Sequence, residues 1–201
     1  MENALQVKAA TYPTDKREVI LRAAFELFCQ KGPKNTTTTG IARAAGISVG
    51  TLYKYYPNKK ALFLDMYELY FFDIASPSFD MLKNLDKPFA LMEFFEYVVD
   101  ATVQGHDYAS KHIHDIMMAL IHYDEEFKRK DNQCKLKLVD ELLPFLSRLG
   151  FAAPHIREKL HFTLNVLELY AHEVAYKETE GLEYEYIKET MVKFIGNIVF
   201  S

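Results

Sequence analysis

The chain has 201 residues, of which 49% are hydrophobic and 26% charged. This composition excludes a largely disordered chain, and the length suits one large domain or a small domain joined to a larger one. The two cysteines, Cys29 and Cys134, form no C-x-x-C pair, and no stretch is apolar enough for a secretory signal or a membrane span. We therefore expect free thiols and a cytoplasmic protein that does not bind membranes.

Charge is distributed unevenly along the chain. The formal net charge is −4, yet residues 1–65 hold ten Lys and Arg against five Asp and Glu, which gives this segment +5 and the remainder −9. A basic segment on an acidic body is typical of a protein that offers one end to phosphate groups.

The first predicted helix follows Pro13, with Thr14 or Asp15 as its N-cap. Gly32 and Pro33 are expected to end it, because glycine favours helix C-termini and proline breaks helices.

Three further helices are predicted before residue 75. The second begins in the threonines at 36–39 and stops at Gly46. The third is capped by Ser48 and runs to about Tyr56, and Asn58 caps the fourth.

The rest of the sequence is also helical in pattern, with scarce alternating β-branched runs. Helices are predicted near 88–104, 108–130, 134–149, 155–179 and 183–200, with breaks at Pro77, Pro88, Gly150–Pro154 and Gly181. The pattern therefore predicts an all-α fold, in which a small N-terminal three-helix head precedes a larger helical bundle.

The second and third helices have the spacing of a helix-turn-helix, with the tight turn at Gly46-Ile47-Ser48. Hydroxyls and ammonium groups here suit phosphate contacts, Thr51 and Lys54 suit base edges, and a glycine at 50 permits close approach of DNA. The expected DNA-binding residues are Thr38, Ser48, Val49, Gly50, Thr51, Tyr53, Lys54, Tyr55, Lys59 and Lys60.

The run from Ile41 to Leu62, IARAAGISVGTLYKYYPNKKAL, resembles the DNA-binding signature of TetR-family regulators. Tyr56 stands where the family usually has Phe. The matching positions are Gly46, Ile47, Ser48, Gly50, Thr51, Leu52, Tyr53 and Lys59.

The resemblance implies a ligand-responsive transcriptional regulator, a repressor that a small-molecule effector releases from double-stranded operator DNA. It implies a DNA-binding domain at 1–58 and an effector-binding domain at 59–201, which forms a homodimer through its last two long helices. No cofactor is expected. The pocket candidates are Phe71, Phe94, Tyr97, Met118, His122 and Asn165.

Two other classes of function are weighed against this interpretation. Gly46–Gly50 fits the G-x-S-x-G motif of α/β-hydrolases, but that motif needs a strand before Ser48, where the pattern predicts a helix. We therefore expect no enzyme. The second class is an architectural DNA-binding protein without an effector, which a C-terminal domain without a cavity would favour.

Histidines and acids cluster in the C-terminal part. His106, His112, His114 and His122 lie near Asp107, Asp115 and Asp124, and His112 with Asp115 is the better-spaced pair for a metal. We expect solvated or pocket-lining histidines and no metal site. His161, Asn165, Glu168 and His172 share one helix face, for which a solvent-facing stripe is the first interpretation, and a pocket or a dimer interface the second.

Overall fold

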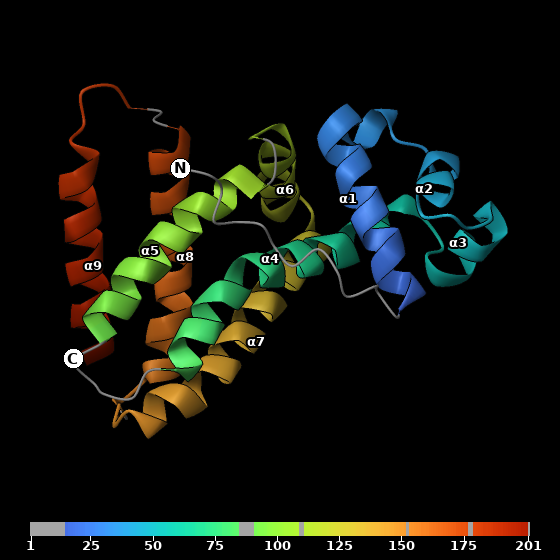
Figure 1. Cartoon of the computed structure of the whole chain (residues 1–201). Helices are drawn as coiled ribbons and strands as arrows, with labels where there is room; N and C mark the ends of the chain where they lie inside the picture. Colours follow the sequence, from blue (N-terminus) through green and yellow to red (C-terminus); the bar gives the residue numbers. More distant parts are fainter. Residues whose placement is uncertain (1–14, 85–90, 109–110, 152, 177–178, 201) are drawn as a thin grey trace. The chain divides into compact units, whose positions relative to one another are not determined.

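The computed structural model describes residues 15–84, 91–108, 111–151, 153–176 and 179–200, and every element in these ranges is an α-helix. The all-α fold class is therefore confirmed. Figure 1 shows the helices in chain order. They are α1 (Lys16–Asn35), α2 (Thr38–Ala44), α3 (Val49–Tyr55), α4 (Lys59–Lys83), α5 (Leu91–Tyr108), α6 (Lys111–Tyr123), α7 (Glu125–Arg148), α8 (Ile156–Tyr176) and α9 (Tyr184–Phe200).

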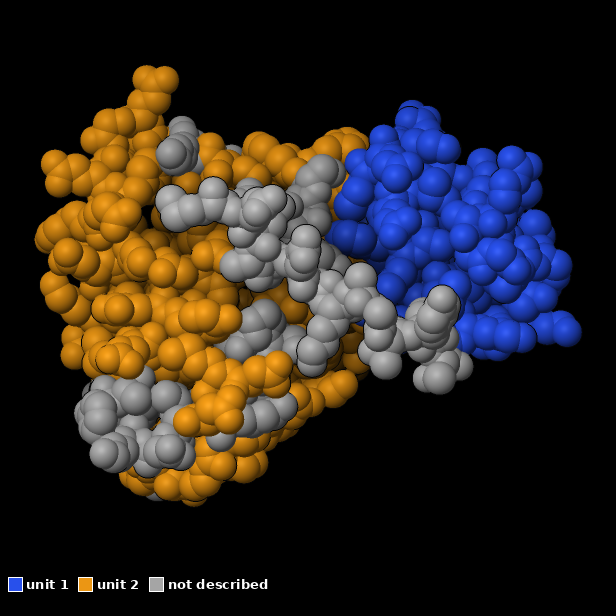
Figure 2. All heavy atoms as spheres, viewed as in Figure 1, with its two compact units in different colours: residues 1–66 blue, residues 67–201 orange. Residues whose placement is uncertain are grey.

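The chain divides into two compact units, residues 1–66 and residues 67–201, which Figure 2 colours separately. Unit 1 holds α1 to α3 and the beginning of α4, and unit 2 holds the rest of α4 and α5 to α9. None of the helices in the described ranges combines the length and apolarity that a bilayer crossing requires.

The predicted caps of unit 1 are present. Asp15 accepts a hydrogen bond from the Arg17 amide at 2.8 Å, so Asp15 is the N-cap, while Pro13 and Thr14 lie outside the described residues. The expected end of the first helix at Gly32 is confirmed in part. Gly32 leaves helical geometry at φ 75°, and one further turn begins at Pro33 and ends at Asn35, because proline suits the first turn of a new helix.

The core of unit 1 is small and mainly aliphatic, with a few aromatic side chains packed within it. Phe28 is fully buried, and its ring lies 5.1 Å from that of Phe63. Tyr56, at the position where the TetR signature has Phe, is buried too, and Arg17 donates to its hydroxyl at 3.1 Å. Arg17 also forms an ion pair with Asp65, so polar contacts lie at the edge of this core.

Two predicted helix breaks in unit 2 are wrong. Helix α4 continues through Pro77, since one proline removes only one backbone hydrogen bond from a helix of 25 residues. The break expected between 130 and 134 lies instead at Asp124, whose carboxylate accepts bonds from the Glu126 and Phe127 amides at 2.9 and 3.3 Å. Breaks at Gly150–Pro154 and Gly181 are confirmed, and Pro88 lies outside the described residues.

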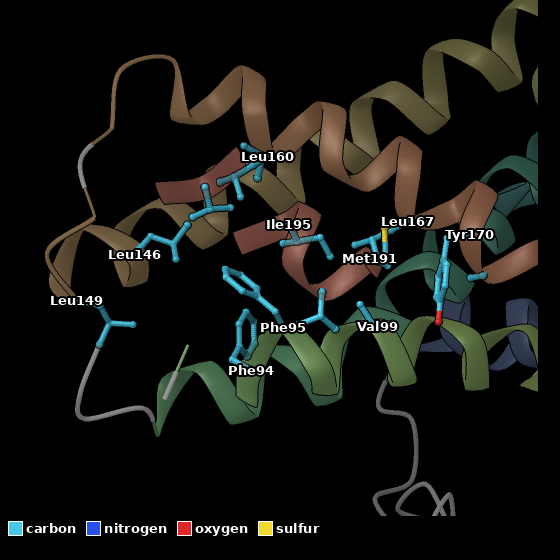
Figure 3. Close-up of a cluster of buried hydrophobic side chains, with 14 residues drawn as sticks. Phe94, Phe95, Val99, Leu146, Leu149, Leu160, Leu167, Tyr170, Met191 and Ile195 are labelled. Atoms are coloured by element: carbon cyan, nitrogen blue, oxygen red, sulfur yellow. The ribbon is translucent and has the colours of Figure 1, made fainter. Parts of the chain in front are cut away.

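The core of unit 2 is formed by α5, α7, α8 and α9, with α5 packed against both α8 and α9 (Figure 3). Val99 on α5 and Val199 on α9 are completely buried. Helix α5 also approaches α4 so closely that a Cβ at Gly105 would lie 2.6 Å from Ile74 Cγ2. These contacts leave room for a cavity lined by α4 to α9, described below.

Candidate nucleic-acid interface

Helices α2 and α3 form the expected helix-turn-helix. Thr37 caps α2 by accepting from the Gly40 amide at 3.0 Å, and Gly46 makes the turn with φ 65°, a conformation that glycine adopts without strain. Ser48 then caps α3, its hydroxyl accepting from the Thr51 amide at 3.0 Å. Local hydrogen bonds therefore fix the beginning of both helices.

Helix α3 has one buried face and one exposed face. Leu52 is 1% exposed and anchors the helix to the core of unit 1. Tyr53 is 49% and Tyr55 39% exposed, and Gly50 and Lys54 are exposed as well. Large aromatic residues at such exposure leave the outward face of α3 able to contact a partner.

Hydroxyl groups on this surface bond to one another. The Thr38 hydroxyl lies 3.2 Å from that of Tyr53, which links α2 to α3. The Ser48 hydroxyl lies 2.8 Å from that of Thr51. These pairs hold four of the predicted DNA-binding side chains in defined positions, and the half-buried Val49 stands between the capping serine and Gly50.

Lys59 differs in environment from the other expected phosphate contacts. Its ammonium donates to the Pro33 carbonyl at 2.6 Å and to the Thr36 carbonyl at 3.1 Å. It therefore satisfies carbonyls at the end of α1, a role that sequence spacing does not reveal. The exposed Lys60 follows it at the start of α4.

Unit 2 contains a cavity of about 170 Å³. One buried water needs about 10–15 Å³ on the same measure, so the space is far larger than a structural water site. Its walls are mainly apolar, with ionisable groups gathered in one region. Phe71, Phe94 and Met118, predicted from the sequence, line it.

The other three pocket candidates do not line the cavity. On α5 the lining residues Phe94, Val98 and Ala101 follow helical spacing, and Tyr97 falls outside that stripe and is 37% exposed. His122 is likewise exposed. Asn165 contacts a lining residue instead, since its side-chain oxygen accepts a bond from Lys135 at 2.9 Å.

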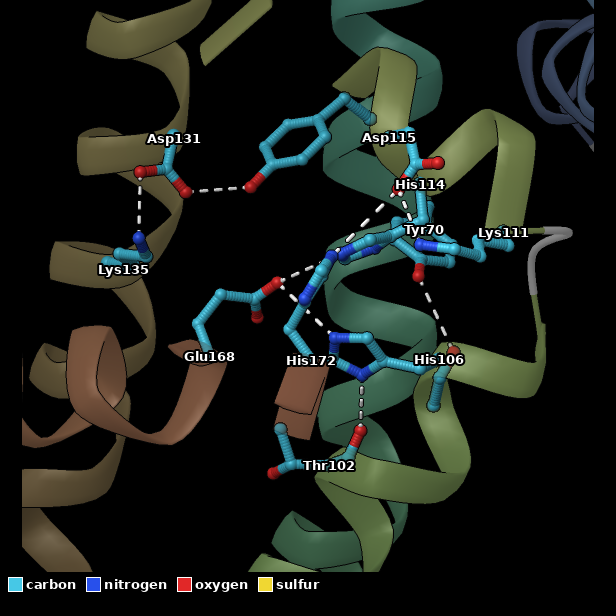
Figure 4. A network of polar contacts seen from close by, with 12 residues as sticks. Tyr70, Thr102, His106, Lys111, His114, Asp115, Asp131, Lys135, Glu168 and His172 are labelled. Atoms are coloured by element: carbon cyan, nitrogen blue, oxygen red, sulfur yellow. Dashed lines mark hydrogen bonds and ion pairs between the residues drawn. The ribbon is translucent and has the colours of Figure 1, made fainter. Parts of the chain in front are cut away.

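A buried polar network occupies one part of the cavity wall (Figure 4). Asp131 accepts hydrogen bonds from the Tyr67 hydroxyl at 2.7 Å and from the Lys135 ammonium at 2.8 Å. Of the predicted stripe on α8, Glu168 lines the cavity, so the solvent-facing interpretation is wrong for this residue. Beside the network, burial raises the pKa of the Cys134 thiol to about 12.

Histidines on α5 and α6 face Glu168 within this wall. Burial lowers the pKa of His114 to about 4, so the ring is neutral at pH 7. Burial by itself raises the pKa of Glu168, but the neighbouring His106 and Lys135 outweigh it and bring the pKa below its usual value. His112, which sequence spacing paired with Asp115, is exposed.

The profile of the family described as "Bacterial regulatory proteins, tetR family" matches residues 20–66. The regulator YuxN of Bacillus subtilis is 25% identical over 158 residues, covering 78% of this chain and 54% of YuxN. AcrR of Shigella flexneri is 31% identical over 91 residues, which cover 44% of this chain and 42% of AcrR. The chain thus spans about half the length of these curated relatives.

Solved structures of other proteins superimpose on nearly the whole length of this chain. A transcriptional regulator of Streptomyces coelicolor superimposes with a TM-score of 0.69 at 13% identity, covering 92% of this chain and 99% of that one. Thermus thermophilus FadR, a TetR-family repressor solved with lauroyl-CoA, gives a TM-score of 0.61 at 25% identity, covering 92% and 95%. Residues 20–66 are thus similar to the TetR family in sequence, and nearly the whole chain shares the fold of these solved structures.

The TetR-family match covers most of α1, all of α2 and α3, and the beginning of α4, which is the part that carries the helix-turn-helix. The residues that line the cavity, from Tyr67 to Ile195, lie outside the matched residues. The G-x-S-x-G motif is not a nucleophile elbow, because α2 rather than a strand precedes Ser48.

Proposed function

We propose that this chain is a TetR-like, sequence-specific DNA-binding transcriptional regulator without catalytic activity, and that it represses its target gene. The observation that carries the proposal is α3, which buries Leu52 and exposes Gly50, Tyr53 and Lys54 on its other face. A helix held in this way, after a tight turn, fits the major groove.

Each exposed residue has a role that its chemistry suits. Thr51 and Lys54 read base edges, and the hydroxyls of Thr38, Tyr53 and Tyr55 bond phosphates, with Lys60 adding charge and Ser48 and Val49 bringing backbone amides close. Lys59 acts chiefly by supporting the end of α1. Residues 1–58 bind DNA, and residues 59–201 bind the effector and dimerise.

The regulator acts as a homodimer. Two recognition helices must be about 34–36 Å apart to enter successive major grooves of a near-palindromic operator. Exposed apolar side chains support a dimer interface formed by α8 and α9. Phe162 is 56%, Leu169 71% and Tyr186 67% exposed. Side chains of this kind are usually covered by a partner when they gather on neighbouring helices.

Leu169→Glu is expected to weaken dimerisation about 100-fold or more, because each carboxylate buried without a partner costs several kcal/mol. Sedimentation at several protein concentrations measures the monomer–dimer equilibrium. Leu182→Glu is the matched control, since Leu182 is exposed but precedes α9. Equal dimer affinity in wild type and Leu169→Glu would remove this face from the interface.

A small molecule in the cavity controls DNA binding. Mostly apolar walls with charged groups in one region suit an amphipathic effector, with an apolar body and a polar end. Thermus thermophilus FadR, which resembles this chain, was solved with lauroyl-CoA. The effector binds more tightly to a state of the dimer in which the two DNA-binding domains are wrongly spaced for the operator. The coupling free energy between effector binding and DNA binding is about 1–3 kcal/mol. The cavity favours this view over an architectural protein without an effector.

Selection from a pool of random duplexes is expected to recover a near-palindromic sequence, whose affinity falls steeply with salt. Lys54→Ala should then weaken binding to that duplex by about 5- to 150-fold and relax base preference at one position per half-site. Lys128→Ala, which removes an exposed lysine from α7, is the control for charge. Fluorescence anisotropy with labelled duplexes measures both the affinity and the base preference. No duplex binding at any salt concentration would refute the proposal.

A further inference from the structure

Three ionisable side chains from three different helices converge in the cavity wall. They are His106 on α5, His114 on α6 and Glu168 on α8 (Figure 4). One carboxylate oxygen of Glu168 lies 3.6 Å from Nε2 of His106 and 3.6 Å from Nε2 of His114. All three ligand atoms lie within 4.8 Å of one another.

The ring of His106 is oriented by the backbone. Its Nδ1 lies 2.9 Å from the Thr102 carbonyl oxygen, which can only accept a hydrogen bond, so Nδ1 carries the proton and donates it. In the neutral ring the lone pair is then on Nε2, the atom that faces Glu168. A histidine that donates to a carbonyl through one nitrogen and faces inward with the other is typical of metal ligands.

The ring of His114 is also placed to bind a metal ion. It is 3% exposed, and its Nε2 faces the same carboxylate oxygen of Glu168 as Nε2 of His106 does. Among the residues that the structure describes, none accepts or donates a hydrogen bond at its Nε2. A buried polar atom in this state is destabilising unless a further group completes it.

An ion pair alone does not account for the cluster. A distance of 3.6 Å between nitrogen and oxygen exceeds that of a hydrogen bond, whereas a charged pair in direct contact is held at about 2.7–2.9 Å. Ligand atoms around one ion are spaced differently. Bonds of 2.0–2.2 Å in tetrahedral geometry place neighbouring ligand atoms about 3.4 Å apart, close to the spacing seen here.

We propose that His106, His114 and Glu168 bind a divalent transition-metal ion, with zinc as the ion that suits them best. Two imidazole nitrogens and one carboxylate form a ligand set common in zinc sites that keep a position open. The three residues also line the cavity, so water or a bound molecule supplies the fourth ligand from there. The inference goes beyond the proposed regulation and does not depend on DNA binding.

The test uses the full-length chain without any affinity tag, stripped of metal with a chelator and dialysed. Titration with Zn²⁺ in competition with a chromophoric chelator is expected to give one ion per chain. His114→Asn and Glu168→Gln should each weaken binding by about 100-fold or more, because even indirect support of a ligand contributes 10- to 100-fold. His112→Asn, an exposed histidine two residues from His114 on α6, should bind as wild type does.

A second readout separates loss of the site from loss of the fold. Co²⁺ is expected to give visible absorption bands of a four-coordinate site in wild type and in His112→Asn, and none in Glu168→Gln. Circular dichroism verifies that Glu168→Gln remains folded. If His114→Asn does not fold, the test rests on Glu168→Gln alone. The proposal is overturned if wild type binds no zinc, or if a folded Glu168→Gln chain binds it with unchanged affinity.

Discussion

Asp131→Ala is expected to lower the free energy of unfolding by about 3–5 kcal/mol, the usual cost of breaking a buried ion pair from one side. Asp131 is 5% exposed and accepts bonds from both Lys135 and Tyr67. Its removal leaves the Lys135 ammonium, in a residue 8% exposed, with the Asn165 amide oxygen as its remaining acceptor within the described part of the chain. Urea unfolding at pH 7, followed by circular dichroism, measures the loss.

The double variant Asp131→Leu with Lys135→Met tests the reason for this loss. Because both charges leave together, it is expected to recover most of the stability that the single change removes. Asp140→Ala is the matched control, since Asp140 lies on the same helix and pairs with Arg157 at 2.7 Å in an exposed position. That change should alter stability little. Equal losses in the single and double variants would contradict the buried-charge explanation.

Phe28→Ala is expected to cost about 3–5 kcal/mol as well, through the cavity it opens against Phe63. The loss falls on unit 1, whose core is small, so DNA binding should disappear although no exposed residue of α3 has changed. Hydrogen exchange followed by mass spectrometry is expected to show lost protection in α1 to α3 and retained protection in α8 and α9.

Phe28→Leu is the control, because a leucine fills most of the same space and such exchanges usually cost less than about 1.5 kcal/mol. It should keep both the protection of α1 to α3 and the affinity for DNA. If Phe28→Ala binds the selected duplex as wild type does, the buried aromatic pair is not what holds the recognition helix in place.

Much of unit 1 is predictable because local chemistry determines it. Asp15, Ser48 and Asn58 cap helices through side-chain bonds to amides two or three residues away, and all three are evident from the sequence. Gly46 marks its turn for the same reason. The family signature adds to these signals, since it covers the same residues.

Unit 2 is less predictable because its decisive contacts join distant residues. Sequence spacing paired His112 with Asp115, whereas packing of α6 brings His114 close to Glu168, which is 54 residues further along the chain. Tyr97 and Phe94 look equally suited to a pocket until the buried stripe of α5 is known. The helix break near Asp124 was missed although its cap is local, because the apolar pattern continues across it.

The buried thiol of Cys134 has a practical consequence. Only a thiolate attacks alkylating reagents, and a pKa of about 12 leaves almost none of it at neutral pH while α7 stays packed. In a Cys29→Ser background, the rate of alkylation therefore reports how often this part of α7 opens to solvent. Occupancy of the neighbouring cavity by any molecule that steadies α7 will be visible as slower labelling, without a fluorescent reporter or knowledge of the operator.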